Sequence, residues 1–121
     1  MESILTSIKK MLGITEEDTT FDADIIIYIN SVFTTLMQLG VGPSAGFYIE
    51  DAISEWSDFI EDLTNLQAVK TYVFLKVKLL FDPGSVGAST LASYERQIQE
   101  LEWRLNVIAE SGESNETIET I

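Results

Sequence analysis

The sequence predicts a small, mainly all-α protein: a four-helix domain whose last two helices form a hairpin. Apolar residues recur at steps of three and four in four separate segments. Glycine and proline interrupt the chain between these segments, at Gly13, at 40–43 and at 82–84. A chain of 121 residues holds one domain with one modest core. We therefore place that domain in residues 1–110 and a flexible acidic tail in residues 111–121.

The first two predicted helices have clear boundaries. A short helix begins near Ile4, and Gly13 supplies a left-handed residue at its end. The second begins at Asp22, whose carboxylate can accept hydrogen bonds from the free amides of the first turn, and it stops at Gly40. Ile27 is one of the residues that widen its apolar face, so we expect this helix to be covered on two sides.

The stretch 41–64 loses the helical period. Residues 47–49 are typical of a short extended piece, and the residues after them fit either a helical turn or the return strand of a β-hairpin. The stretch holds six acids and no base between residues 50 and 62. Two interpretations stay open for Trp56 and Phe59: a protruding loop that meets a partner, or a lid folded back on the core.

The third helix begins with Thr64 or Asn65 as cap and runs to Phe81. Its side chains are apolar around most of the circumference, so it is expected to be buried against its own chain or another subunit. Asp82 and Pro83 end it, because proline disfavours a helical residue before it.

The fourth helix, from about Thr90 to Glu110, has the most regular pattern. Trp103 falls outside its apolar seam, which we expect to pack antiparallel on the third helix. The seam residues lie three and four apart: Leu91, Tyr94, Ile98, Leu101, Leu105 and Ile108.

The composition excludes much chemistry. Cysteine and histidine are both absent, so there is no disulfide, thiolate nucleophile, Cys or His zinc site or Ser-His triad. Asp22 and Asp24 are explained as helix-start residues, and the acids near Glu50 lack the spacing of an EF-hand. We expect no catalytic site, no metal and no cofactor, and therefore not an enzyme.

The charge also limits the partners. Seven basic and 20 acidic residues give a net charge of -13, which disfavours specific DNA binding and docking on anionic lipids. No apolar run has the length of a signal peptide or a membrane span. We expect a soluble protein that is made in the cytoplasm.

Taken in order, several short motifs resemble the head-tail connector (portal adaptor) proteins of long-tailed phages. The resemblance spans residues 4–107, and its most specific pieces are 80–83 and 101–105. Typical members carry a second proline where this chain has Gly84, which leaves that loop looser. The motifs are Met11-Leu12-Gly13, Phe21-Asp22-Ala23-Asp24, Trp56-Ser57-Asp58-Phe59, Leu79-Leu80-Phe81-Asp82-Pro83 and Gln99-Glu100-Leu101-Glu102-Trp103-Arg104-Leu105-Asn106.

The resemblance implies a structural subunit of the virion that forms a homo-oligomeric ring under the portal protein. Such a ring extends the channel through which DNA passes without specific binding, and it offers a docking surface to a stopper or tail-completion protein. Assembly would take place in the host cytoplasm. The alternative from another class is a small acidic regulatory or inhibitory binding protein, such as a DNA mimic.

Large apolar residues in acidic or irregular surroundings are the candidate partner contacts. An acidic tail with two isoleucines is a segment that can order when it binds. The candidates are Phe47, Tyr48, Trp56, Phe59, Trp103, Ile118 and Ile121.

Overall fold

The computed structural model describes residues 2–61 and 63–120, with the side chains of 63, 85 and 111–120 outside the description. These residues form helices and turns, which confirms the mainly all-α fold class. The four expected helices are present, and a short fifth one lies in the stretch whose conformation was open. The elements are α1 (Ile4–Met11), α2 (Asp22–Gln38), α3 (Trp56–Phe59), α4 (Leu66–Phe81) and α5 (Ala88–Thr120), with 3-10 turns at Leu63–Asn65 and Pro83–Ser85.

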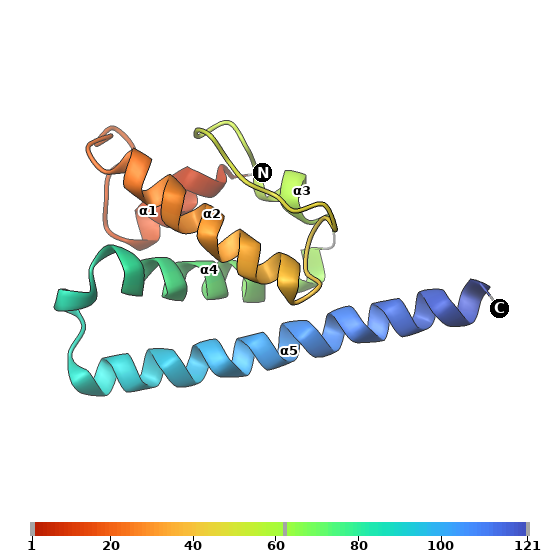
Figure 1. The fold of residues 1–121 in the computed structure, drawn as a ribbon. Helices are drawn as coiled ribbons and strands as arrows, with labels where there is room; N and C mark the ends of the chain where they lie inside the picture. The colour runs from red at the N-terminus through yellow and green to blue at the C-terminus, as the bar shows by residue number, and fades with distance from the viewer. Residues whose placement is uncertain (1, 62, 121) are drawn as a thin grey trace.

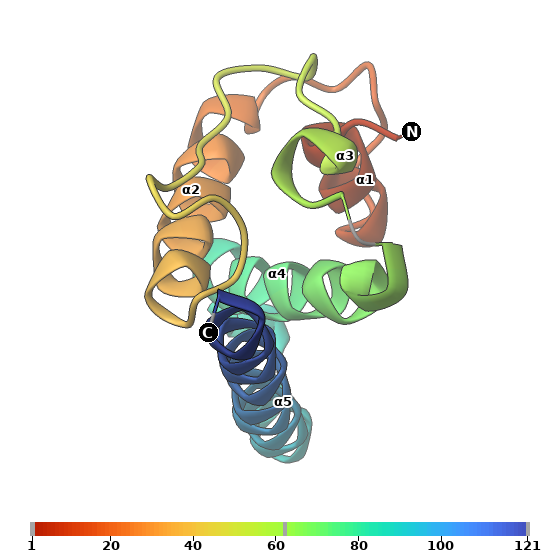
Figure 2. The ribbon, with the colours of Figure 1, turned by 90° about the vertical axis from the view of Figure 1, so that its right-hand side faces the viewer.

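Helix α4 lies in the middle of the fold. Helices α1 and α2 cover it on one side and α5 crosses its other side (Figures 1 and 2). This placement follows from its sequence, because an almost entirely apolar helix must be covered on more than one face. Its fully or nearly fully buried side chains are Val69, Tyr72, Val73, Leu75 and Val77.

Helices α4 and α5 form the predicted antiparallel hairpin (Figure 1). Ile98 and Leu105 of the seam are buried, 8% and 2% exposed, whereas its end residues Leu91 and Ile108 are 37% and 44% exposed, so the seam packs on α4 over its middle part. The Tyr72 hydroxyl donates a 2.7 Å hydrogen bond to Glu102 Oε2 and joins the two helices. The amide of Asp82 still bonds to the Lys78 carbonyl at 3.0 Å, so α4 ends directly before the proline.

Helix α5 is longer than predicted. We expected helix to about Glu110, whereas α5 extends to Thr120 and its C-terminal end lies beyond the other helices (Figure 1). That the acidic tail 111–121 is flexible in the free protein and orders on a partner stays a prediction.

Helix α1 is short, and buried contacts hold it in place. The Ser3 hydroxyl caps it by accepting a 3.3 Å hydrogen bond from the Thr6 amide. Ile4, Leu5 and Ile8 are 0 to 2% exposed. Gly13 follows with a φ of 83°, which confirms the predicted left-handed end.

Lys9 is a buried charge in this helix, with its side chain 3% exposed. Its ammonium lies 2.8 Å from Asp22 Oδ1 and donates a hydrogen bond to the Glu16 carbonyl at 3.1 Å. These two partners tie α1 to the loop that follows it and to the start of α2. The prediction that Asp22 caps α2 is therefore wrong: Phe21 occupies the cap position without a side-chain bond, and the Asp22 carboxylate faces Lys9 because a buried ammonium needs a counter-charge.

The predicted alternative of a short β-hairpin in 41–64 is wrong for the described residues, which contain no strand there. Side chains satisfy this backbone instead. The side-chain Nδ2 of Asn30 donates a 2.9 Å hydrogen bond to the Ile49 backbone carbonyl, and the side-chain Oδ1 of Asn30 accepts a 2.7 Å hydrogen bond from the Ile49 backbone N–H. One isolated bridge pairs Ser3 with Glu55. The backbone of this stretch therefore needs no partner strand. Its hydrogen bonds are made with the Asn30 side chain of α2 and with the backbone at the N-terminus.

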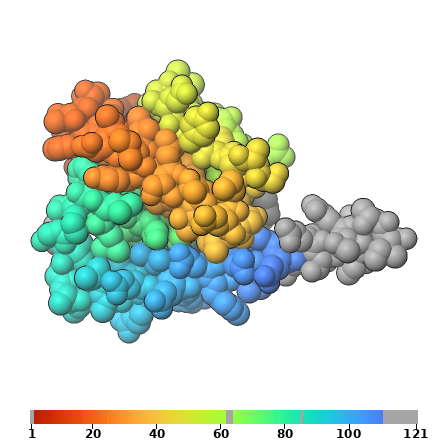
Figure 3. All heavy atoms as spheres, in the orientation of Figure 1, coloured from red at the N-terminus to blue at the C-terminus, as the bar shows by residue number. Residues whose placement is uncertain are grey.

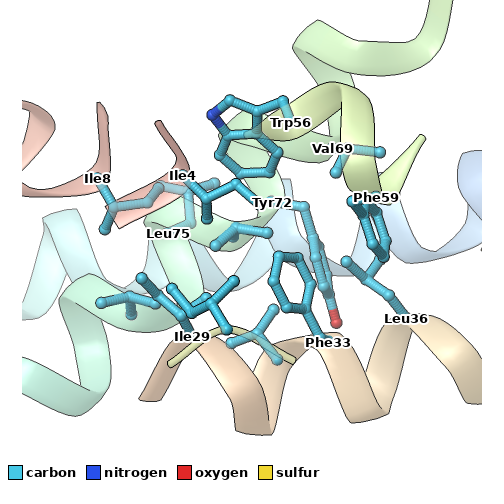
Figure 4. Close-up of a cluster of buried hydrophobic side chains, with 14 of the residues drawn as sticks. Ile4, Ile8, Ile29, Phe33, Leu36, Trp56, Phe59, Val69, Tyr72 and Leu75 are labelled. Carbon is cyan, nitrogen blue, oxygen red and sulfur yellow. The ribbon is translucent and has the colours of Figure 1, made fainter. Parts of the chain in front are cut away.

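An aromatic cluster closes the core above α2 and α4 (Figure 4). The Phe33 ring stacks on Phe59 at 4.6 Å between centroids and meets Phe47 and Trp56 edge-on at 5.4 and 6.3 Å. Such pairs add to the free energy gained by burial. The Trp56 indole N–H donates to the Ser7 hydroxyl at 2.8 Å, so its polar atom is satisfied inside the core.

Gly42 allows this cluster to close. Its φ is 85°, and a Cβ placed on it would lie 2.4 Å from the Phe59 ring. Gly13 has a similar φ of 83° but open space where a Cβ would be. Substituting each of these two glycines by alanine therefore distinguishes the free-energy cost of the left-handed backbone, which both share, from the cost of steric overlap, which only Gly42 has.

We predict that Gly42→Ala lowers the free energy of unfolding by about 2–4 kcal/mol, because a left-handed backbone strain adds to overpacking against Phe59. Gly13→Ala should cost only the backbone part, about 1–2 kcal/mol. Urea denaturation followed by circular dichroism measures both. Equal losses in the two variants would contradict the close packing of Phe59 on Gly42.

We predict that Lys9→Ala destabilises the protein by about 3–5 kcal/mol, because it leaves a partly buried carboxylate without its counter-charge. The neighbouring Lys10→Ala is the matched control. Its side chain is 60% exposed and 3.3 Å from Glu2, so its loss should cost less than about 1 kcal/mol. Thermal unfolding of both variants measures the difference, and similar melting temperatures would contradict the role of Lys9.

Candidate interaction surfaces

Two of the predicted contact residues belong to the core. Trp56 is 0% and Phe59 4% exposed, and both point into the cluster around Phe33 (Figure 4). Of the two open interpretations, the structure has the lid folded back on the core. Trp56 and Phe59 therefore offer no exposed surface to a partner. Phe47 is half-buried and packs on Phe33 and Phe59, so it too contributes to the lid.

Tyr48 lies on an exposed part of the same loop. Its side chain is 70% exposed, and that of Ile53 is 81% exposed. Together with Glu50, Asp51 and Ser54 they line an open hollow of about 380 Å³. Asp51 shapes the loop by accepting a 2.9 Å hydrogen bond from the Ile53 amide. The sequence indicated Tyr48 but not Ile53, because an isolated isoleucine among acids fits a core position equally well.

Trp103 is the large exposed residue of α5, at 68%. It lies two residues before the buried Leu105, which puts the two side chains about 160° apart around the helix. Val107, one turn further on, is 38% exposed. Arg104 and Glu100 form an exposed ion pair beside them. The prediction that Trp103 lies outside the seam is confirmed.

The remaining two candidates cannot be placed on a surface. Ile121 lies outside the described residues, and for Ile118 only the helical backbone is described. Their contact with a partner stays a prediction.

A groove between α2, α4 and α5 was not predicted from the sequence. It has a volume of about 410 Å³, and Leu80, 46% exposed, is one of its apolar walls. Glu102 lies at its side, and burial together with this carboxylate raises the pKa of Tyr72 well above its usual value. Tyr72 therefore stays a hydrogen-bond donor at any physiological pH, and its role is to join α4 to α5.

Ile27 is exposed at 63%, so the expectation that α2 is covered on two sides is met only in part. Three successive isoleucines occupy residues 25–27, and a helix turns by about 100° per residue, so they cannot all face one neighbour. Ile25 is fully buried instead. The loop covers α2 further along, at Asn30, Phe33 and Met37.

The described residues contain neither a metal site nor a membrane span. No three acidic side chains among them are grouped as ligands for an ion. Within the same residues no helix combines the length and the apolar character needed to cross a bilayer. The arrangement offers a closed core and several large exposed apolar side chains, which are candidates for contacts with a partner.

Comparison with known proteins decides the family. A model of a family described as phage connector protein matches residues 4–112, almost the whole chain. The chain belongs to the phage connector protein family. No curated protein and no solved structure matches it. The match covers all four helices predicted from the sequence, together with the loop that packs on α2.

As a phage connector, the protein has a structural role in the virion and interacts with other proteins of the phage head and tail. The family is structural and not enzymatic. Its exposed apolar residues are accordingly candidates for contacts with other proteins. The family match also favours a connector over the alternative of an acidic regulatory protein.

The different burial of the two tryptophans can be measured. We predict that Trp103→Phe leaves one blue-shifted emission from Trp56 that acrylamide quenches poorly. Trp56→Phe should leave red-shifted, readily quenched emission from Trp103, because that indole is in water. Steady-state fluorescence of the folded variants checks this, with urea-unfolded protein as the control. Equal quenching of both variants would contradict the placement of Trp56 in the core.

Proposed function

We propose that this connector is the adaptor subunit of a ring that assembles beneath the portal protein of a filled head, in the host cytoplasm. The ring extends the DNA channel and gives the stopper or tail-completion protein its docking surface. The observation that carries the proposal is the family match over residues 4–112.

The distribution of apolar side chains supports an assembling subunit. The core is closed by its own residues, yet Ile27, Tyr48, Ile53 and Trp103 are each more than 60% exposed. They come from α2, the loop and α5, so they lie on different parts of the body. A subunit in a ring needs contacts with two neighbours, with the portal and with the next tail protein, and such separate surfaces fit that need.

The charge supports a channel through which DNA moves. With a net charge of -13, the subunit has no general attraction for a polyanion, because DNA binding depends on lysine and arginine replacing counterions. A ring of such subunits would repel the duplex from its wall and let it slide.

The C-terminal tail is our candidate for the portal contact. The end of α5 lies beyond the other helices (Figure 1), where a neighbouring protein can reach it without disturbing the core. The segment 111–121 adds three acids and two isoleucines and no base. Acidic segments with a few apolar residues can order on a basic or grooved partner.

We predict that the full chain co-migrates with purified portal, and that deletion of residues 111–121 weakens the complex at least about tenfold, as the loss of a contact worth ~1.4 kcal/mol or more does. Native mass spectrometry and sedimentation measure binding and copy number.

Two matched variants separate the causes of the loss. One replaces Ile118 and Ile121 by serine and keeps the acids; the other replaces Glu113, Glu116 and Glu119 by glutamine and keeps the isoleucines. Equal portal binding by the truncated chain would refute the tail assignment alone. A full chain that ignores portal at every concentration would refute the adaptor function.

A further inference from the structure

Two exposed surfaces of this chain have complementary chemistry. The first, which we call the loop surface, consists of Tyr48, Glu50, Asp51 and Ile53 around the hollow described above. All four side chains are exposed. The segment from Tyr48 to Glu55 carries three acids and no base. The surface thus presents an aromatic ring and an isoleucine framed by negative charge.

The second, which we call the helix surface, lies on the side of α5 that faces away from α4. It consists of Arg96, Trp103, Arg104 and Val107, all exposed. Arg96 precedes the buried Ile98 by two residues just as Trp103 precedes Leu105, so both point away from the seam. The surface holds both arginines of the chain. An exposed tryptophan between arginines is the composition of an interface centre.

The two surfaces lie on opposite sides of the molecule. The loop after α2 is at the top of Figures 1 and 2 and α5 is at the bottom of both. The space-filling view shows the same separation, with the yellow-green loop above and the blue helix below (Figure 3). One copy therefore cannot join its own two surfaces.

We propose that the loop surface of one copy docks on the helix surface of the next copy. Tyr48 and Ile53 would pack on Trp103 and Val107, and the acids of the loop would face Arg96, since Arg104 is already paired with Glu100 of its own helix. Two different surfaces on opposite sides make a head-to-tail contact, which repeats from copy to copy and closes a ring when the rotation allows it. The inference rests on the proposed ring and goes beyond it by naming the faces that meet.

Charge favours a second copy over other occupants of the helix surface. Copies with a net charge of -13 repel one another, so a contact between copies is favoured where local charges are opposite. The loop surface supplies acids beside apolar contact area, and the helix surface supplies Arg96 beside apolar contact area, with Arg104 paired to Glu100 at its edge. Such complementarity fixes which faces meet.

The absence of cysteine from the chain permits a clean cross-linking test. Tyr48→Cys protein is mixed with Trp103→Cys protein, concentrated or bound to portal, and oxidised. We expect a covalent dimer from the mixture and none from either variant alone. Ile27→Cys mixed with Trp103→Cys is the matched control, because Ile27 is 63% exposed but belongs to neither surface. Mass measurement of the unmodified chain reports the oligomer separately.

A charge exchange tests the same contact without cysteines. Arg96→Glu should reduce assembly by roughly two- to fivefold, the effect of one exposed ion pair. A mixture with Glu50→Arg, which presents the opposite charge on the loop surface, should recover it. Neither residue has a role in the core, so both variants should keep the unfolding midpoint of the parent.

The outcomes separate the inference from the function on which it rests. If oligomers form but the Tyr48→Cys and Trp103→Cys mixture cross-links no more than the Ile27→Cys control, the inference is wrong, whereas the proposed ring still stands. A covalent dimer from Trp103→Cys alone would overturn it in favour of a symmetric contact. If portal protects Trp103 from solvent while the two cysteine variants do not cross-link, the helix surface binds portal and not a second copy. A chain that stays monomeric with portal present would overturn both.

Discussion

The burial of α4 on two opposite sides is the constraint on which the rest of this structure depends. Its apolar side chains cover most of the circumference, so a single neighbour cannot remove them from water. Helices α1 and α2 cover one side and α5 covers the other. The Tyr72 hydroxyl then fixes the second contact by its hydrogen bond to Glu102. Every exposed surface is placed by this three-layer arrangement.

A few polar contacts determine how the remaining chain closes around that core. Lys9 joins α1 to the start of α2 through Asp22, Asn30 holds the backbone of Ile49, and Trp56 reaches Ser7. Each satisfies a group whose burial without a partner would cost free energy. The loop is therefore a fixed lid of the core, although it has almost no regular structure. This is why its exposed residues keep a defined place at the surface.

The division of the large apolar side chains between the core and the surface suits a connector protein. The core takes up the largest apolar groups of the loop and leaves Tyr48, Ile53 and Trp103 in water. Exposed tryptophan and tyrosine side chains can supply the central contacts of an interface. Because the acidic charge disfavours indiscriminate association, contacts form only where a surface offers a matching shape and charge. A subunit whose core is closed by its own residues can fold by itself before it meets its neighbours in the virion.

The sequence by itself determined the helices of the body and the class of protein. Periodicity placed α1, α2, α4 and the seam of α5, and Gly13, Gly40 and Pro83 marked ends that the structure confirms. These features are local, because a period or a turn residue acts within a few positions of the chain. The absence of His and Cys also pointed away from catalysis, and the short motifs pointed to the connector family.

Only the tertiary structure decided which aromatic residues are inside. Trp56 and Phe59 stand among acids, and their burial depends on Phe33 and Ser7, which lie far away in the sequence. The same holds for Asp22, whose partner Lys9 is on another helix, and for Ile27, which the run of isoleucines could not place. A local period indicates which face of a regular helix is buried, but the burial of single residues in a loop and the pairing of charges depend on what the chain brings together across the fold.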